Sequence, residues 1–151
     1  MPIVYFDSSA LVKLLVEEDG SEIAAALWDG CDAPVSNRLA HPEVRAALAA
    51  AARAHRLSRA GRSHAEAMWE EYWAALHVVE LSEAISSRAG QLAAMHALGG
   101  ADAVHLASGL AVGASATVFA VWDARLATGA LRAGFQVAPN HPDGKASIKA
   151  S

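Results

Sequence analysis

The chain has 151 residues, of which 54% are hydrophobic and 19% are charged, and its formal net charge is −4. This length and composition favour a single globular domain with a sizeable core. No apolar run approaches the ~20 residues of a membrane-spanning helix, and the first residues lack the basic flank of a signal peptide. The net charge argues against a protein that holds nucleic acid through its bulk charge, although a local basic strip is compatible with it.

Cys31 is the single cysteine of the chain. It excludes an intrachain disulfide and a cysteine-rich zinc site, and it fits a reducing compartment. We therefore expect a cytoplasmic protein.

Short runs rich in β-branched and aromatic residues alternate with longer segments of helical character. Ser58 and Ser82 each precede a helical segment and are candidate N-caps. Pro42 is tolerable only near the first turn of its helix. The predicted strands are residues 2–6, 33–36, 77–81, 117–122 and 135–138. The predicted helices are residues 9–15, 22–28, 37–56, 59–76, 83–97, 101–112 and 123–133.

This alternation predicts an α/β fold with a central parallel sheet and helices on both faces, a three-layer α/β/α sandwich. The domain spans residues 1–140, and we expect the polar residues 141–151 to be a disordered tail. In open α/β sheets the functional site lies outside the carboxyl ends of the strands.

Four acidic residues recur where predicted strands pass into helices. Asp7 and Asp123 each follow an apolar strand, while Glu43 and Asp102 lie in the first turns of helices. A carboxylate beside apolar surface is costly unless its charge is compensated, and Mg²⁺ prefers oxygen ligands of this kind. If the four side chains meet at one end of the sheet, they form a metal site.

Each of these acids also has a simpler explanation. Asp7, Asp102 and Asp123 could be helix N-caps, and Glu43 could interact with the positive end of its helix. Independent caps account for each residue singly. They do not explain why both strand-end acids follow an apolar strand.

Two histidines near these acids have competing interpretations. His105 lies on the same helix face as Asp102 and could contact that acid or a substrate, although a packing role is more common. The sequence His41-Pro42-Glu43 is similar to the His-x-Glu of zinc deaminases, but the Pro-Cys-x-x-Cys partner is absent.

Two further groups of side chains each allow two interpretations. An aromatic stripe on one helix indicates a core or dimer contact, or a groove for a partner helix. A basic stretch between two helices indicates a solvated corner or a contact to phosphates. The stripe comprises Met68, Trp69, Tyr72 and Trp73, and the basic stretch comprises Arg53, His55, Arg56, Arg59 and Arg62.

Four segments resemble those of PIN-domain ribonucleases of the VapC toxin type. Residues 5–14 read Tyr-Phe-Asp-Ser-Ser-Ala-Leu-Val-Lys-Leu, and residues 43–48 read Glu-Val-Arg-Ala-Ala-Leu. Residues 102–107 read Asp-Ala-Val-His-Leu-Ala, and residues 122–126 read Trp-Asp-Ala-Arg-Leu. Each segment alone is weakly specific, but all of them in this order, at domain-compatible spacing, indicate the family.

The resemblance implies a PIN-like fold in which Asp7, Glu43, Asp102 and Asp123 hold one or two Mg²⁺ or Mn²⁺ ions. It further implies cleavage of RNA, a homodimer, and a cognate antitoxin that blocks the site. The chain departs from the family at Val121, where a small hydroxyl residue is frequent. It also has Gly99 and Gly100 where the family often has an arginine.

Further site residues are expected beside the acids. Ser9 could hydrogen-bond the acids or cap the helix, and three basic residues are candidates for phosphate contact. These are Lys13, Arg38 and Arg125. Two alternative functions remain: a phosphatase of the haloacid dehalogenase type, which would need an Asp where Ser9 stands, and a catalytically silent PIN-like binding module.

Overall fold

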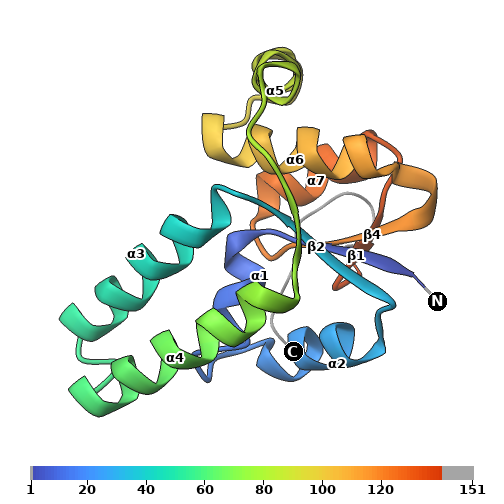
Figure 1. Cartoon of the computed structure of the whole chain (residues 1–151). Coiled ribbons are helices and arrows are strands. Elements are labelled where there is room, and N and C mark those ends of the chain that lie inside the picture. The colour runs from blue at the N-terminus through green and yellow to red at the C-terminus, as the bar shows by residue number, and fades with distance from the viewer. Residues whose placement is uncertain (1, 141–151) are drawn as a thin grey trace.

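The computed structural model describes residues 2–140, which form one five-stranded sheet with helices on both faces (Figure 1). The strands are all parallel and lie in the order β3-β2-β1-β4-β5. They are β1 (Ile3–Phe6), β2 (Ala33–Asn37), β3 (His77–Val79), β4 (Thr117–Ala120) and β5 (Gln136–Ala138). The predicted three-layer α/β/α sandwich is therefore confirmed.

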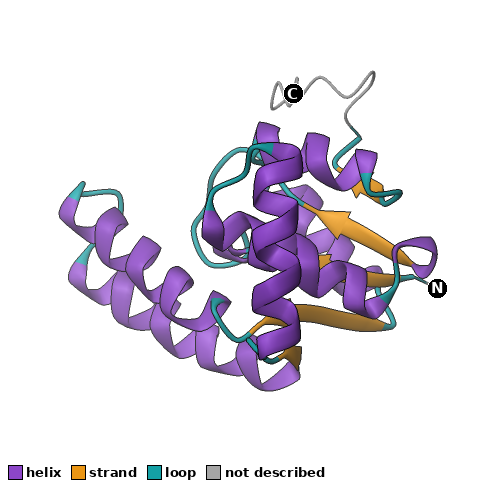
Figure 2. Ribbon diagram, turned by 90° about the horizontal axis from the view of Figure 1, so that it is seen from above, coloured by secondary structure: helices purple, strands orange, loops and turns teal. Residues whose placement is uncertain are grey.

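The helices divide between the two faces of the sheet (Figure 1). Helices α5, α6 and α7 pack on one face around Tyr5 and Phe119, and α1 to α4 pack on the other around Phe6 and Trp69. Figure 2 shows that the α3–α4 pair extends well beyond the sheet. The helices are α1 (Ser8–Val12), α2 (Ser21–Gly30), α3 (Ala40–Arg53), α4 (Arg59–Ala75), α5 (Glu83–His96), α6 (Gly100–Val112) and α7 (Ala124–Arg132).

The predicted caps and the position of Pro42 are confirmed. The Ser58 hydroxyl accepts from the Gly61 N–H at 2.9 Å, and the Ser82 hydroxyl accepts from the Ile85 N–H at 3.2 Å. Pro42 lies in the first turn of α3, where its missing N–H costs no helical hydrogen bond.

Three predicted helix boundaries were wrong, and one of them is the end of the third helix, which lies at Arg53 rather than at residue 56. The first helix ends at Val12 rather than Leu15, because the chain passes into turns there. The third helix begins at Ala40 rather than at residue 37. Asn37 belongs to β2, and its side-chain oxygen accepts from the Leu39 N–H at 2.8 Å, which makes a turn before the helix.

Within residues 2–140 no helix combines the length and the apolar character needed to cross a bilayer. The short 3₁₀ helix Ala114–Ala116 before β4 was not predicted. The tail predicted at residues 141–151 lies outside the described residues.

The turn before α2 depends on a glycine that touches the chain beside Asp123. Gly20 has a φ of +91°, and a Cβ built there would lie 2.6 Å from Nε1 of Trp122. We predict that Gly20→Ala lowers the free energy of unfolding by about 1–3 kcal/mol, because both the backbone conformation and the contact resist a side chain. Denaturant melts measure this loss.

Gly30→Ala is the matched control. Gly30 is helical, and a Cβ there would meet nothing within 4 Å. Alanine should therefore be neutral or stabilising at this position. Equal losses for the two variants would contradict the importance of the Gly20 turn.

Candidate active site

The central strand delivers the most buried acid within residues 2–140. Asp7 directly follows β1, its side chain is nearly buried, and its N–H donates to the Ala120 carbonyl of β4 at 3.3 Å. Because β1 and β4 are adjacent and parallel, Asp123, which follows β4, leaves the sheet at the same edge. Glu43 on α3 and Asp102 on α6 approach this edge from opposite faces. The topology therefore brings the strand-end acids and the helix-start acids to the same edge of the sheet.

Asp7 is held by local hydrogen bonds. Its Oδ1 accepts from the Ser9 hydroxyl at 2.7 Å and from the Ala10 N–H at 3.0 Å, so it caps α1. Burial raises the pKa of Asp7 to about 6, and the charge of Asp102 adds to this rise. His105 and the two hydrogen-bond donors lower the pKa, but they do not outweigh the burial.

The neighbours of Glu43 favour its ionised form. Burial alone would raise its pKa, but hydrogen bonds from His105 and Ser8 outweigh the burial and place the pKa below its ordinary value. The Ser8 hydroxyl and Nε2 of His105 each lie 2.6 Å from Oε1 of Glu43. Its two hydrogen-bond partners therefore meet at one oxygen.

Asp102 and Asp123 interact electrostatically. Asp102 is half-buried, and its pKa is raised first by burial and then by the charge of Asp123, with a further contribution from Glu43. Asp123 is exposed and accepts from the Leu126 N–H at 2.9 Å, so it caps α7. The cap interpretation is thus correct for Asp7 and Asp123 as a local role, whereas α6 is capped by Gly99 rather than by Asp102.

The donor chemistry of this cluster suits a hard divalent cation. Oδ1 of Asp7 and Oε1 of Glu43 take all the hydrogen bonds of their carboxylates within residues 2–140, which leaves Oδ2 and Oε2 open. In the same residues, no three His, Cys, Asp or Glu side chains are already gathered closely enough to hold a metal ion. Carboxylates that repel one another would need to move inward around a cation, which offsets that repulsion.

His105 occupies a position that the sequence only partly predicted. Its side chain is buried, and its Nε2 contacts Glu43 rather than Asp102. Its Nδ1 lies 2.7 Å from the Tyr5 hydroxyl. Tyr5 and Ser8 were missed, although the period of a strand places Tyr5 on the same side of β1 as Asp7.

The three predicted phosphate contacts differ in availability. Nζ of Lys13 lies 3.2 Å from Glu18, and Arg38 makes a bidentate pair with Glu80. The Arg125 guanidinium instead makes one long bond, 3.4 Å, to the Ala97 carbonyl. Arg125 is therefore the cation most open to an added anion.

Arg125 lines an open hollow of about 480 Å³ that includes Ala124, the residue after Asp123. Its charged side chains come from Arg125 and Arg132, and no acidic residue of the described chain lines it. His96 also lines it, and Nδ1 of His96 is buried with no hydrogen-bond partner in residues 2–140.

The predicted basic stretch forms the corner between α3 and α4. Arg62 lies 2.7 Å from Glu66, and Arg56 lies 3.7 Å from Glu18. These ion pairs favour the solvated-corner interpretation for both arginines.

The aromatic stripe on α4 serves more than one role. Trp69 is fully buried in the core, which confirms the packing interpretation for that residue. Trp73 instead lines a mostly apolar hollow of about 460 Å³ at the start of α3. The other lining residues are Arg38, Leu39, His41, Pro42 and Leu81.

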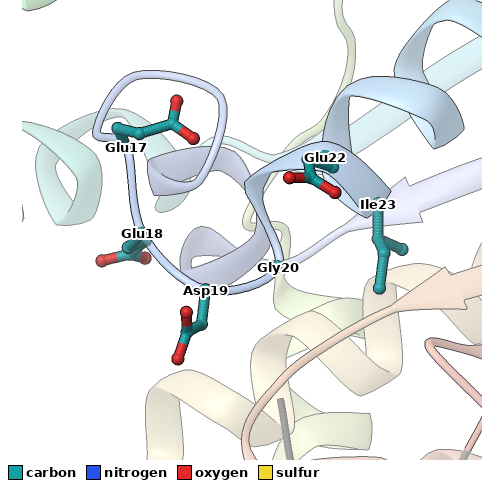
Figure 3. A pocket seen from close by; sticks show the side chains of 6 residues that line it. All are labelled: Glu17, Glu18, Asp19, Gly20, Glu22 and Ile23. Atoms are coloured by element: carbon teal, nitrogen blue, oxygen red, sulfur yellow. The ribbon is translucent and has the colours of Figure 1, made fainter. Parts of the chain in front are cut away.

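An acidic hollow of about 320 Å³ lies at the loop between α1 and α2 (Figure 3). Figure 3 shows that the carboxylates of Glu17, Glu18 and Asp19 point in different directions. Glu18 is already paired with Lys13. This loop therefore does not offer the convergent acids that the strand edge offers.

Residues 4–127 match the family described as PIN domain. Two relatives from Mycobacterium tuberculosis are each 62% identical over 143 residues, which cover 95% of this chain and 99% of theirs. They are Ribonuclease VapC45 of strain CDC 1551 / Oshkosh and Ribonuclease VapC49 of strain ATCC 25618 / H37Rv. The chain therefore belongs to the PIN domain family, as a member of its VapC type.

Solved structures share the fold at low sequence identity. FitAcB from Neisseria gonorrhoeae has a TM-score of 0.65 at 14% identity, covering 89% of this chain and 95% of that one. VapBC2 from Rickettsia felis, bound to a promoter DNA fragment, has a TM-score of 0.57 at 10% identity, covering 80% and 87%. A toxin-antitoxin complex from Klebsiella pneumoniae has a TM-score of 0.57 at 18% identity, covering 80% and 86%.

The raised pKa of Asp7 predicts a pH-dependent stability. Between about pH 4 and 6 the unfolded chain has released the proton that folded Asp7, with a pKa of about 6, still binds, so stability falls as the pH rises. We predict that Asp7→Asn removes this decline and stabilises the protein at pH 7 in chelator by on the order of 1–3 kcal/mol. Denaturant melts from pH 4 to 8 measure it.

Asp123→Asn is the control, because Asp123 is an exposed cap and Asn caps a helix about as well as Asp. Its stability should stay within about 0.5 kcal/mol of the wild type. Millimolar Mg²⁺ should stabilise the wild type and not Asp7→Asn. Parallel pH curves for the wild type and Asp7→Asn would show that the burial of this carboxylate has no energetic consequence.

Proposed function

We propose that this protein is a metal-dependent endoribonuclease, the toxin of a toxin-antitoxin pair, which hydrolyses phosphodiester bonds of RNA. The observation that carries the proposal is the acidic cluster at the carboxyl edge of the sheet, formed by the residues that match the family motifs. Relatives that are 62% identical and named ribonucleases support the same activity.

We assign Asp7, Glu43, Asp102 and Asp123 as the metal ligands and catalytic acids. A bound Mg²⁺ or Mn²⁺ would supply an activated water and screen the charge of the phosphodiester. Glu43 enters the reaction ionised, because His105 and Ser8 stabilise its carboxylate. Asp7 and Asp102 have raised pKa values, so a cation would favour the ionised forms that they need as ligands.

The two alternative functions, a phosphatase and a silent binding module, fit the site less well. A haloacid-dehalogenase-type phosphatase would need an acid where Ser9 stands, and the Ser9 hydroxyl instead donates to Asp7. A silent binding module would have no need for a set of interacting acids that costs stability.

We also infer a cytoplasmic location, a homodimer and a protein antitoxin as partner. The hollow lined by Trp73 and Leu81 offers apolar surface for such a contact. An arginine of the antitoxin would suit the acidic cluster, because its planar fork matches carboxylates. The solved structures that share this fold include FitAcB, VapBC2 and a toxin-antitoxin complex from Klebsiella pneumoniae.

The activity is tested first at Asp102. We predict that the wild type cleaves RNA in Mg²⁺ or Mn²⁺ and that Asp102→Asn loses nearly all activity, because the amide keeps the shape but not the charge that binds the cation. Cleavage of a labelled RNA at matched protein and metal concentrations measures it. Wild-type rates in the variant would exclude Asp102 from the site.

The hollow beside α7 provides a second test. We predict that Arg125→Gln and Arg132→Gln each raise KM by about two- to fivefold, the scale of one exposed charged contact, with little change in kcat. Each substitution should also reduce the slope of log K for RNA binding against log salt concentration by about one unit. Arg88→Gln on α5 is the charge-matched control, and an equal effect from it would indicate bulk charge instead.

A further inference from the structure

Three layers of the fold meet at one buried imidazole. Tyr5 comes from the central strand, His105 from α6 on one face, and Glu43 from α3 on the other. The Tyr5 hydroxyl lies 2.7 Å from Nδ1 of His105, and Nε2 lies 2.6 Å from Oε1 of Glu43. The three side chains thus form a continuous line of hydrogen bonds from the core to the acidic cluster.

The core end of this line is rigid. Tyr5 is fully buried, and its ring stacks on Phe119 with centroids 5.0 Å apart. The His105 ring meets the Tyr5 ring edge-on at 5.8 Å. A tyrosine hydroxyl carries its proton near neutral pH and can donate it in a hydrogen bond.

A protonated hydroxyl fixes the chemistry of the imidazole. When the Tyr5 O–H donates to Nδ1 of His105, that nitrogen must accept, and the ring proton then lies on Nε2. Nε2–H is the donor that the ionised Glu43 carboxylate requires. Tyr5 therefore selects the tautomer that binds Glu43.

Glu43, at the other end of this line of hydrogen bonds, needs partners that fix its side chain. The Glu43 side chain is 28% exposed, and a glutamate has several rotatable bonds whose freedom must be lost before it can hold a ligand. His105 and Ser8 both bind Oε1, which leaves Oε2 without a hydrogen-bond donor in residues 2–140. The open oxygen is thereby set in one place at the acidic cluster.

We propose that Tyr5 and His105 are positioning residues that fix the Glu43 side chain through Oε1, with its Oε2 presented to the catalytic cation. This inference rests on the proposed function for the identity of the cation. The pair touches neither the substrate nor the metal, and it acts through Glu43.

The tautomer is tested in the full chain without metal. Histidine ¹⁵N NMR in chelator should show His105 of the wild type with a proton on Nε2 and none on Nδ1, and Tyr5→Phe should lose this preference. A proton on Nδ1 in the wild type would overturn the inference, and so would an unchanged tautomer in Tyr5→Phe. Tyr72→Phe removes a hydroxyl from α4 instead and should leave the His105 signals unchanged.

The positioning is tested by calorimetric titration with Mn²⁺ alone. Tyr5→Phe should raise the Kd for Mn²⁺ by about 10-fold and His105→Leu by up to about 100-fold, the scale of losses when a partner of a metal ligand is removed. His105→Gln keeps an N–H near the place of Nε2 and should recover most of the affinity. Tyr72→Phe should bind as the wild type does.

The outcomes separate this inference from the proposed function. Mn²⁺ binding by the wild type with unchanged affinity in Tyr5→Phe and His105→Leu would overturn the positioning alone. No Mn²⁺ binding by the wild type would overturn the metal-dependent function together with it. If His105→Leu does not fold, Tyr5→Phe and His105→Gln decide the question.

Discussion

The burial of a carboxylate at the end of the central strand is the constraint on which the rest of the site depends. Asp7 is nearly excluded from water, and burial raises its pKa to about 6. Two local donors, the Ser9 hydroxyl and the Ala10 N–H, compensate part of its charge. The remaining cost stays with the folded protein at neutral pH. A cation is the partner that would remove it, because the charge of the nearby Asp102 adds to this cost.

Burial does not affect the ionisation of all the acids of the site in the same way. Glu43 has a lowered pKa and Asp102 a raised one, although both are partly buried. The difference follows from their neighbours: Glu43 faces His105 and Ser8, whereas Asp102 faces Asp123. The Glu43 carboxylate is thus held ready in its charged form, whereas Asp7 and Asp102 depend on an added positive charge. We infer that the binding of a cation is coupled most strongly to the ionisation of Asp7 and Asp102.

The sequence could predict the features that arise from local patterns. The alternation of strands and helices, the Ser58 and Ser82 caps and the placement of the acids at strand ends are all local. The partners of His105 could not be predicted in this way. Tyr5 and Glu43 lie 100 and 62 positions from it in the chain, and only the stacking of three layers brings them together. The boundary error at residue 37 has the same origin, because pairing of Asn37 with Val79 overrides the helical preference of its neighbours.

The distribution of paired and unpaired basic side chains among the described residues bears on how a chain with a negative net charge can act on RNA. Its net charge of −4 offers RNA no general attraction, so binding must come from particular groups. Most of the described basic side chains near the edge, such as Arg38 and Lys13, are already paired with acids, whereas Arg125 and Arg132 line an open hollow beside Asp123. A phosphodiester lying over the acids would then gain one attraction from a bound cation and another from these arginines. Neither source alone would hold it against the repulsion of the cluster, so metal loading and RNA binding should be coupled rather than independent.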